Sequence, residues 1–300
     1  MIRRTRPGES AVPRRARLTA AVAASGLALT ACGSSESTTT EPGTERTVDG
    51  ELIHVHDVLV GAGGSPVHLA AHTGLYELRD GEPVPRSDRF DDLMAAAIER
   101  DGTLIASGHP DLSREDLRVA GKPPLLGLVE SEDGSMWAPR SLLGDVDFHA
   151  LVVADGRLYG ADSTSARVLV SDDGGQTWQA RTGDAQLLDL AVDPTDPDRM
   201  VGADLDRGLI VSDDGGNSWE PVAGAPQLIH LEWTSRSLVG IDAEGAIMTS
   251  TDAGVTWAPV APLLRAEAVG SDGTDLYVYS PRVGLHRSTD DGESWTEVTP

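Results

Sequence analysis

Six apolar segments, which recur about every forty residues along the chain, each carry a histidine or a carboxylate at one aligned position. Imidazole combined with carboxylate is a ligand set that suits Zn, Cu, Ni or Fe ions. Two carboxyl groups with different pKa values are also what most glycoside hydrolases require. These six aligned residues, here called the polar column, could therefore bind a metal or another ligand, or catalyse hydrolysis. Its members are His56, Asp92, His149, Asp189, His230 and Glu267.

Each of these chemistries would use a different part of the column. His56, His149 and His230 come from alternate segments, so in a ring they would face one another and could hold a divalent transition metal. Polar side chains on a channel wall can equally be solvated residues without a ligand. A hydrolase would instead use the acidic members, which are Asp92, Asp189 and Glu267.

A second set of polar residues follows the second apolar stretch of each repeat. His72 and His109 are candidate binding residues at this position. Asp side chains at strand ends commonly accept backbone N–H bonds in turns, and we expect this capping role for the Asp members. His54 precedes His56 by two residues and shares its strand face, which also suits simple packing in the channel wall. The Asp members are Asp162, Asp204 and Asp242.

The elements that position these residues are marked by a repeated turn motif, Ser-x-Asp-x-Gly-x-Thr/Ser-Trp. Asp and Gly favour a tight turn, because the carboxylate accepts backbone N–H bonds and Gly adopts positive φ. The Trp begins the next strand and buries its indole. A calcium-loop interpretation has the wrong spacing of acidic residues, so we expect a purely structural motif. The copies are Ser171–Trp178, Ser212–Trp219, Ser250–Trp257, Ser288–Trp295 and the shortened Ser131–Trp137.

Each repeat contains three apolar strands before the motif and one strand after it. In one repeat they are predicted at Leu187–Val192, Arg199–Ala203, Gly208–Val211 and Ser218–Val222. A degenerate first repeat has only the turn Asp80-Gly81 in place of the motif. Units of about forty residues built from four short strands are typical of β-propeller blades. The sequence predicts an all-β propeller of six four-stranded blades over residues 51–300, whose blades begin near 52, 90, 146, 187, 228 and 264.

Propeller topology brings the polar residues together. The first strand of each blade lines the central channel. First strands begin, and second strands end, on the same face of the ring, whereas the turn motifs lie on the opposite face. Both polar sets are therefore expected at one mouth of the channel, with the longest insertion, residues 109–127, beside it. Long loops on a rigid scaffold are frequent sites of function.

The turn motif resembles the Asp-box, or bacterial neuraminidase repeat (BNR), of β-propeller proteins. The chain is similar to bacterial secreted lipoproteins of the sialidase-like, glycosyl-hydrolase-labelled BNR group. This resemblance implies the propeller fold, with the box between the third and fourth strands of a blade. Sialidase activity does not carry over, because the sequence has no Arg-Ile-Pro motif and no arginine in either polar set. Among the four tyrosines, only Tyr279 could approach the mouth.

The N-terminal segment has the layout of a secretory signal. Six arginines precede an apolar run from Leu18 to Ala31, which is too short to span a bilayer. The run ends in Leu-Thr-Ala-Cys, which resembles a bacterial lipobox, so Cys32 is the predicted lipidation site. We expect a signal peptide over residues 1–31, exported by the Sec or the twin-arginine route, and a polar tether over residues 32–50.

The chain is strongly acidic, with a net charge of −24 and a single lysine, Lys122. Nucleic-acid binding requires a basic face and is excluded on this ground. We expect a monomer anchored by its lipid on the extracytoplasmic face of the cell membrane. It should bind a protein or glycan ligand at the channel mouth and is not expected to be an enzyme. The alternative is a glycoside hydrolase with a sialidase-like fold.

Overall fold

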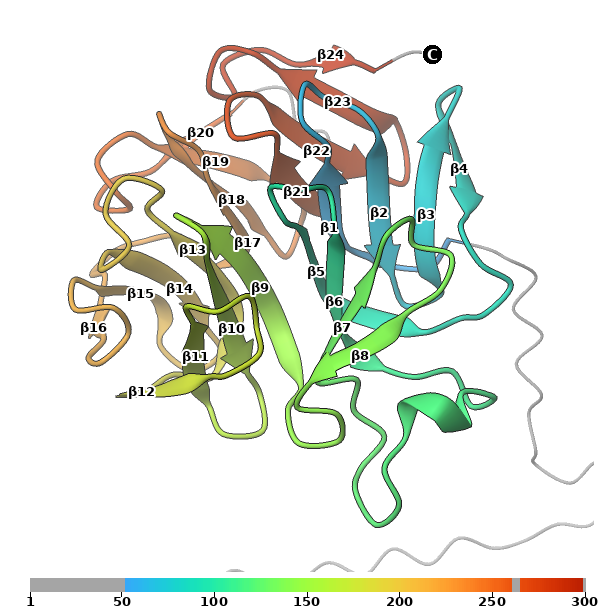
Figure 1. Ribbon diagram of the computed structural model, residues 1–300. Helices are drawn as coiled ribbons and strands as arrows, with labels where there is room; N and C mark the ends of the chain where they lie inside the picture. Colours follow the sequence, from blue (N-terminus) through green and yellow to red (C-terminus); the bar gives the residue numbers. More distant parts are fainter. Residues whose placement is uncertain (1–51, 261–264, 299–300) are drawn as a thin grey trace, which may run out of the picture. The chain divides into compact units, whose positions relative to one another are not determined.

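The computed structural model describes residues 52–260 and 265–298, which form six antiparallel sheets of four strands each (Figure 1). The prediction of an all-β propeller with six four-stranded blades is confirmed. Within the described residues the single helix is the one-turn η1 (Glu115–Leu117). Blade 1 contains β1 (Val55–Val60), β2 (Val67–Ala71), β3 (Gly74–Arg79) and β4 (Glu82–Pro85). Blade 2 contains β5 (Asp92–Ile98), β6 (Leu104–His109), β7 (Leu128–Ser131) and β8 (Ala138–Ser141).

Blades 3 to 6 repeat this arrangement. Blade 3 contains β9 (Phe148–Ala154), β10 (Arg157–Asp162), β11 (Arg167–Ser171) and β12 (Gln179–Asp184). Blade 4 contains β13 (Leu187–Val192), β14 (Met200–Asp204), β15 (Gly208–Ser212) and β16 (Glu220–Pro221). Blade 5 contains β17 (Leu228–Trp233), β18 (Leu238–Asp242), β19 (Ile247–Ser250) and β20 (Ala258–Pro259). Blade 6 contains β21 (Ala268–Ser271), β22 (Leu276–Ser280), β23 (Gly284–Ser288) and β24 (Thr296–Glu297).

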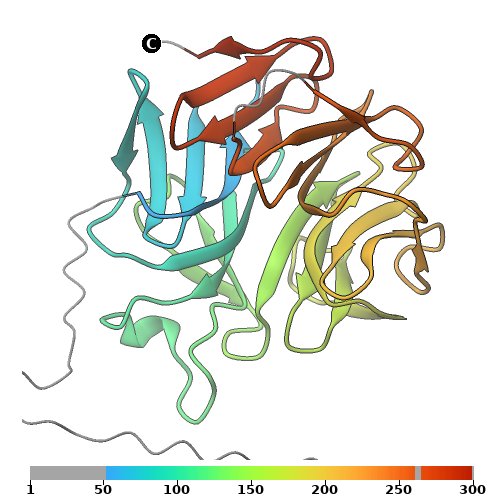
Figure 2. The ribbon, with the colours of Figure 1, turned by 180° about the vertical axis from the view of Figure 1, so that it is seen from behind.

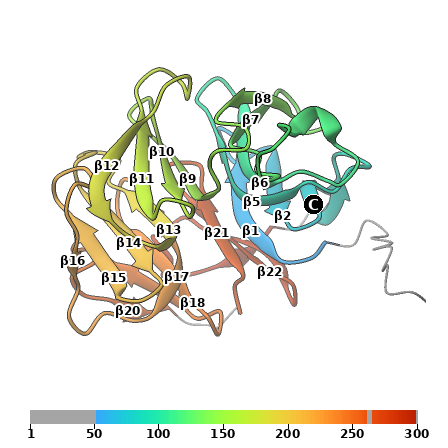
Figure 3. The same cartoon turned by 90° about the horizontal axis from the view of Figure 1, so that it is seen from below.

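The first strand of every blade lies innermost and packs against the first strands of the two neighbouring blades (Figures 2 and 3). Each blade is built from four consecutive strands, so no strand is exchanged between the two ends of the chain. The ring closes where β1 packs on β21. An apolar core that includes Val55, Tyr76, Ala268 and Tyr277 fills this junction. Side-chain packing, rather than a shared sheet, therefore closes the ring.

The Asp-box turns are held by one repeated hydrogen-bond network. In blade 3 the Ser171 hydroxyl accepts the Gly175 N–H (2.8 Å) and donates to Asp173 (2.8 Å). Asp173 accepts both the N–H (2.8 Å) and the hydroxyl (2.6 Å) of Thr177, and these bonds lower the pKa of Asp173 to about 2. Gly175 has φ of +80°, and a Cβ there would lie 2.4 Å from Leu128 of blade 2. The boxes are structural, as predicted.

Each box Trp packs into the apolar core between its own blade and the preceding one. Trp137 and Trp219 are buried, at 5% and 8% exposure. Trp178 contacts Phe148, with ring centroids 5.0 Å apart. Blade 1, which has no box, contributes Tyr76 to its junction with blade 6 instead. Each Asp-box thus connects a turn on one face of the ring to the apolar core between two blades.

The first strands contain a β-bulge that shifts the register within the blade. In blade 1, Val55 pairs with Ala71 but Asp57 pairs with Ala70, so His56 is the extra residue. The extra residues of the next four blades are Met94, His149, Leu188 and Ile229. The ungapped alignment of the six polar residues is therefore wrong. His56 and His149 occupy the bulge, whereas Asp189 and His230 lie one residue beyond it and Asp92 lies before it.

The long insertion in blade 2 is built around a buried arginine. Arg114, 3% exposed, contacts Asp91 (3.3 Å) and Asp116 (2.9 Å) and donates to the Trp137 carbonyl (2.8 Å). Leu117 of η1 is fully buried below it. The insertion leaves the end of β6 and lies at the lower edge of Figure 1. It is a packed element on the mouth face, as its position after a second strand predicted.

The predicted signal peptide, Cys32 and the tether lie outside the described residues, so these stay predictions. In residues 52–260 and 265–298, no helix has the length and apolar character needed to cross a membrane.

Replacing Ser171 by Ala should destabilise the fold by about 1–3 kcal/mol, because the buried Gly175 N–H loses its partner. Urea unfolding followed by tryptophan fluorescence measures this free energy. Ser235→Ala, at an exposed turn position, is the matched control and should change it by no more than about 0.5 kcal/mol. Equal stability of the two variants would contradict the structural role of the box.

Candidate functional site

One mouth of the channel carries a continuous arc of imidazole and carboxylate groups, here called the mouth arc. Successive members contact each other from blade 6 through blades 1 and 2 to blade 3. The arc begins just before β21 and includes residues at the start of β1, in the turn after β2, at the start of β5, at the end of β6 and at the start of β9. Its members, in order, are Glu267, His54, His56, His72, Asp92, His109, Asp147 and His149.

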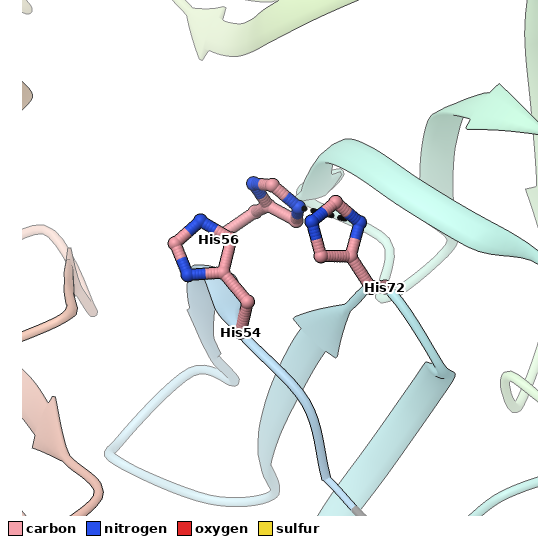
Figure 4. Close-up of side chains that lie close together, drawn as sticks. All are labelled: His54, His56 and His72. Atoms are coloured by element: carbon pink, nitrogen blue, oxygen red, sulfur yellow. Dashed lines mark hydrogen bonds between the residues drawn. The ribbon is translucent and has the colours of Figure 1, made fainter. Parts of the chain in front are cut away.

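Three histidines of blade 1 form the most compact part of the arc (Figure 4). His54, His56 and His72 each place one ring nitrogen within 4.8 Å of the others. His56 Nε2 lies 3.4 Å from His72 Nδ1, and the ring centroids are 4.5 to 5.2 Å apart. Burial, together with His54 and His72, lowers the pKa of His56 to about 3, so this imidazole is neutral. A neutral imidazole is the form that binds metal ions.

Carboxylates hold the two outer rings of this group. His54 Nδ1 lies 2.7 Å from Glu267 Oε1, and His72 Nδ1 lies 2.6 Å from Asp92 Oδ1. Burial opposes ionisation of Asp92, but His109 and His72 outweigh it and lower the pKa of this carboxyl. Asp92 is therefore ionised at neutral pH.

The arc continues through a second carboxylate on blade 3. Asp147, 10% exposed, lies 3.1 Å from His149 Nε2 and 3.9 Å from His109 Nε2. Burial again acts against ionisation, but His149, Ser163 and His109 lower the pKa of Asp147. The side chain of Asp92 raises the pKa of His109 against the effect of burial. From His72 to His149 the arc thus alternates imidazoles with the ionised carboxylates Asp92 and Asp147.

Two residues of the predicted column, Asp189 and His230, lie deeper in the channel. Asp189 accepts the backbone N–H of Leu190 (2.7 Å) and that of Leu231 on the next blade (2.8 Å). His230 Nδ1 lies 3.7 Å from Asp189 and is 16% exposed. Burial lowers the pKa of His230, but Asp189 and other carboxyls beside it raise it overall. Asp189 therefore serves as an inter-blade link.

The channel below the mouth encloses a cavity of about 890 Å³, lined by the first strands of all six blades. Two carboxyl groups on its wall have strongly perturbed pKa values. Burial and the nearby Asp189 raise the pKa of Asp57 to about 7, and burial raises that of Glu232 to about 7. Asp57 accepts the Ala96 N–H (2.8 Å), and Glu232 accepts the Ser271 hydroxyl (2.5 Å). Both carboxyls also link neighbouring blades.

The structure brings most, but not all, of the predicted binding residues together. The predicted set His56, His149 and His230 does not form the compact group, because His149 contacts Asp147 and His230 contacts Asp189. Among the described residues, the group with metal-ligand spacing is His54, His56 and His72. The predicted binding residues in the mouth arc are His56, His72, Asp92, His109, His149 and Glu267; Asp189 and His230 lie below it.

Three residues of the site do not follow from the sequence pattern. The role of a fourth, His54, stays open in the sequence, because the strand face that it shares with His56 also suits packing in the channel wall. Asp147 precedes β9 and so fell outside the aligned strands. Asp57 and Glu232 alternate with other channel residues on β1 and β17, a signal that only the correct register reveals.

The acidic residues at second-strand ends are turn caps, as expected. Asp162 accepts the Thr164 N–H (3.0 Å) and the Ser165 hydroxyl (2.5 Å). Asp204 accepts the Arg207 N–H (2.9 Å), and Asp242 accepts N–H groups of the following turn. These carboxylates stabilise the turns that surround the mouth.

Exposed aliphatic side chains also occur on the mouth face. Seven large hydrophobic residues are exposed in the described chain, and five of them lie on the mouth face, in strand starts, second-strand turns or the insertion. None of the seven is aromatic. The five residues, here called the aliphatic rim, are Ile53, Leu112, Leu188, Leu205 and Val283.

The ring of six four-stranded sheets, with its polar channel mouth, defines this chain as a six-bladed β-propeller. The family model of the BNR/Asp-box repeat matches residues 169–180, which contain the box of blade 3. The chain is thus a β-propeller that carries Asp-box repeats, as the sequence motif predicted. The comparison with curated proteins gives no match.

Several solved structures share the fold at low sequence identity. A chain of the nidogen/laminin complex is 15% identical and has a TM-score of 0.54; the match covers 77% of this chain and 91% of that one. The GH74 xyloglucanase from Xanthomonas campestris is 18% identical with a TM-score of 0.51, over 81% of this chain and 45% of that one. An ancestral GH74 enzyme is 15% identical with a TM-score of 0.50, over 82% and 38%. The chain spans less than half of either GH74 enzyme, and these likenesses show the fold alone.

Glu232→Gln should remove part of the pH dependence of stability. The folded pKa of about 7 exceeds the ordinary value of 4.5, so the folded protein retains a proton that the unfolded chain releases. Stability therefore falls as pH rises from about 4.5 through 7, by on the order of 1–3 kcal/mol for this group. The variant should gain this amount over the native protein at pH 8 and nothing at pH 4.5. Urea unfolding at both pH values measures the difference; the exposed Glu220→Gln is the control, and an unchanged pH slope in Glu232→Gln would contradict the assignment.

Proposed function

We propose that this propeller is a binding module of the extracytoplasmic membrane surface, which docks a partner protein on its mouth face. A basic side chain of the partner enters the mouth arc, and apolar side chains cover the rim. The observation that carries this proposal is the continuous mouth arc of carboxylates and imidazoles across four blades. The membrane location rests on the predicted lipidation of Cys32.

The charge state of the arc supports a cationic ligand. Asp92 and Asp147 have lowered pKa values and are ionised at neutral pH. The Asp92 carboxylate is 31% exposed, so its imidazole neighbours leave part of it open, whereas Asp147 is 10% exposed. A guanidinium or ammonium group could bind the exposed part of Asp92 through charge-assisted hydrogen bonds. Asp147, on the other side of His109, would add negative charge. The net charge of −24 would add long-range attraction for a basic partner.

The aliphatic rim supports a protein partner rather than a glycan. Five of the seven large exposed hydrophobic side chains lie on the mouth face, where a protein partner could cover them. Sugar subsites usually present aromatic rings, and the exposed hydrophobic residues of the described chain are all aliphatic or Met. Leu205 is 61% exposed and Leu112 is 87% exposed, so both are accessible for docking.

The hydrolase alternative has weaker support. A glycoside hydrolase needs one carboxyl with a raised pKa to act as the acid. The candidate Asp92 has a lowered pKa, and Asp189 is engaged by two backbone N–H groups. The raised carboxyls, Asp57 and Glu232, act as links between blades.

Site-specific photo-crosslinking in the native host tests the docking face. A photo-reactive phenylalanine analogue replaces Leu205 on the mouth face in one variant and Val255 in a box turn on the opposite face in its matched control. Their exposures are 61% and 63%. We expect one defined protein adduct from position 205 and none from position 255. Adding Asp92→Asn should lower the yield roughly ten- to hundredfold, because a charge-assisted hydrogen bond of about 1.5–3 kcal/mol is lost.

Three outcomes would contradict the proposal. The same adduct from both positions would indicate non-specific contact. An adduct that is unaffected by Asp92→Asn, and by raising the salt concentration, would remove the role of charge. Turnover of a glycan that is lost in Asp92→Asn would favour the hydrolase.

A further inference from the structure

We propose that His54, His56 and His72 bind one divalent transition-metal ion of the Zn, Cu or Ni class. This site does not depend on the docking partner. The three residues come from the start of β1 and from the turn after β2, two segments that blade 1 holds side by side. Their ligand nitrogens lie within 4.8 Å of one another, which is the spacing of a site that needs only small side-chain rotations.

The closest pair already has the spacing of metal ligands. His56 Nε2 and His72 Nδ1 are 3.4 Å apart. Two nitrogens bound tetrahedrally at ~2.0–2.1 Å from Zn are separated by roughly 3.4 Å. His54, at 47% side-chain exposure, is the most exposed of the three imidazoles and can rotate to complete the site.

Hydrogen bonding leaves a lone pair unused in this group. His72 Nδ1 faces both Asp92 Oδ1, at 2.6 Å, and His56 Nε2, at 3.4 Å. One ring nitrogen carries at most one proton, and the ionised carboxylate is the nearer and stronger acceptor. The proton therefore points to Asp92, and the His56 nitrogen receives at most a weak, shared bond. With its own proton on Nδ1, His56 would offer the Nε2 lone pair to a metal ion, which would also displace the proton of His72 Nδ1.

Carboxylates lie next to two of the three histidines, as they commonly do around metal-binding imidazoles. Metal-binding imidazoles commonly donate their second nitrogen to a carboxylate, which fixes the ring and its tautomer. Glu267 makes this contact with His54 Nδ1 at 2.7 Å. Asp92 lies 2.6 Å from His72 Nδ1 itself, so when that nitrogen binds the metal the Asp92 carboxylate could serve as a fourth ligand. Imidazole-rich sets of this type suit Zn, Cu and Ni, whereas Ca and Mg prefer oxygen ligands alone.

Isothermal titration of the untagged full chain with Zn(II), combined with elemental analysis after dialysis, tests the site. We expect one equivalent of zinc per chain and no binding of Ca(II) at the same concentration. His54→Ala and His72→Ala, both at partly exposed positions, should each weaken zinc binding by about 100-fold or more. His286→Ala, on β23 away from the mouth, is the matched imidazole control and should bind zinc normally. With Cu(II), electron paramagnetic resonance should show imidazole nitrogen coupling that decreases in His72→Ala.

Unchanged zinc affinity in folded His54→Ala and His72→Ala would overturn the proposal, as would the absence of any zinc binding. Loss of binding in His230→Ala together with retention in His54→Ala would instead support the set drawn from alternate blades. Circular dichroism and the thermal midpoint of each variant establish that it is folded, so a misfolded variant is not counted as a loss of ligand. If His72→Ala misfolds, His72→Gln replaces it, because Gln keeps a polar side chain of similar size without the imidazole.

Discussion

The free inner edges of the first strands impose the constraint on which this propeller depends. Each first strand pairs with one neighbour only, so some of its N–H groups face the adjacent blade without a strand partner. Side chains of the preceding blade supply the missing acceptors. Asp57 binds the Ala96 N–H, and Asp189 binds the Leu231 N–H at the equivalent position three blades later. Ser107 binds the Phe148 N–H in the same manner. Polar links therefore join neighbouring blades in addition to the apolar cores between them.

This constraint explains how much of the site the sequence could predict. The strands follow from hydrophobic pattern and box spacing, and β13 begins and ends where the sequence placed it, at Leu187–Val192. The polar character of the channel wall also follows from the sequence. A single bulged residue then decides whether a side chain lies at the mouth, as His56 does, or links blades, as Asp189 does. No local sequence signal marks such a bulge, because the extra residue is His, Met, Leu or Ile in different blades.

The carboxylates on the two faces of the ring make different kinds of contact. On the box face, carboxylates such as Asp173 and Asp214 are occupied by hydrogen bonds within their own turn, and the adjoining Trp fills the seam. On the mouth face, Asp92 and Glu267 bind imidazoles that come from another blade. Contacts of the first kind are repeated in four blades and stabilise them alike. Contacts of the second kind occur once each, which is the pattern of a specific site on a repetitive scaffold.

Blade 1 departs from the repeat at both of its ends. It has no box and no box Trp, so its junction with blade 6 uses Tyr76 and Tyr277. At its other end it supplies all three histidines of the compact group, where the box-bearing blades 3, 4 and 5 have turn-capping Asp residues after the second strand. His72 lies one residue after the position that these capping Asp residues occupy in their blades. Its side chain contacts His56 and Asp92. The blade that is least regular in sequence is thus the one that concentrates the chemistry of the mouth.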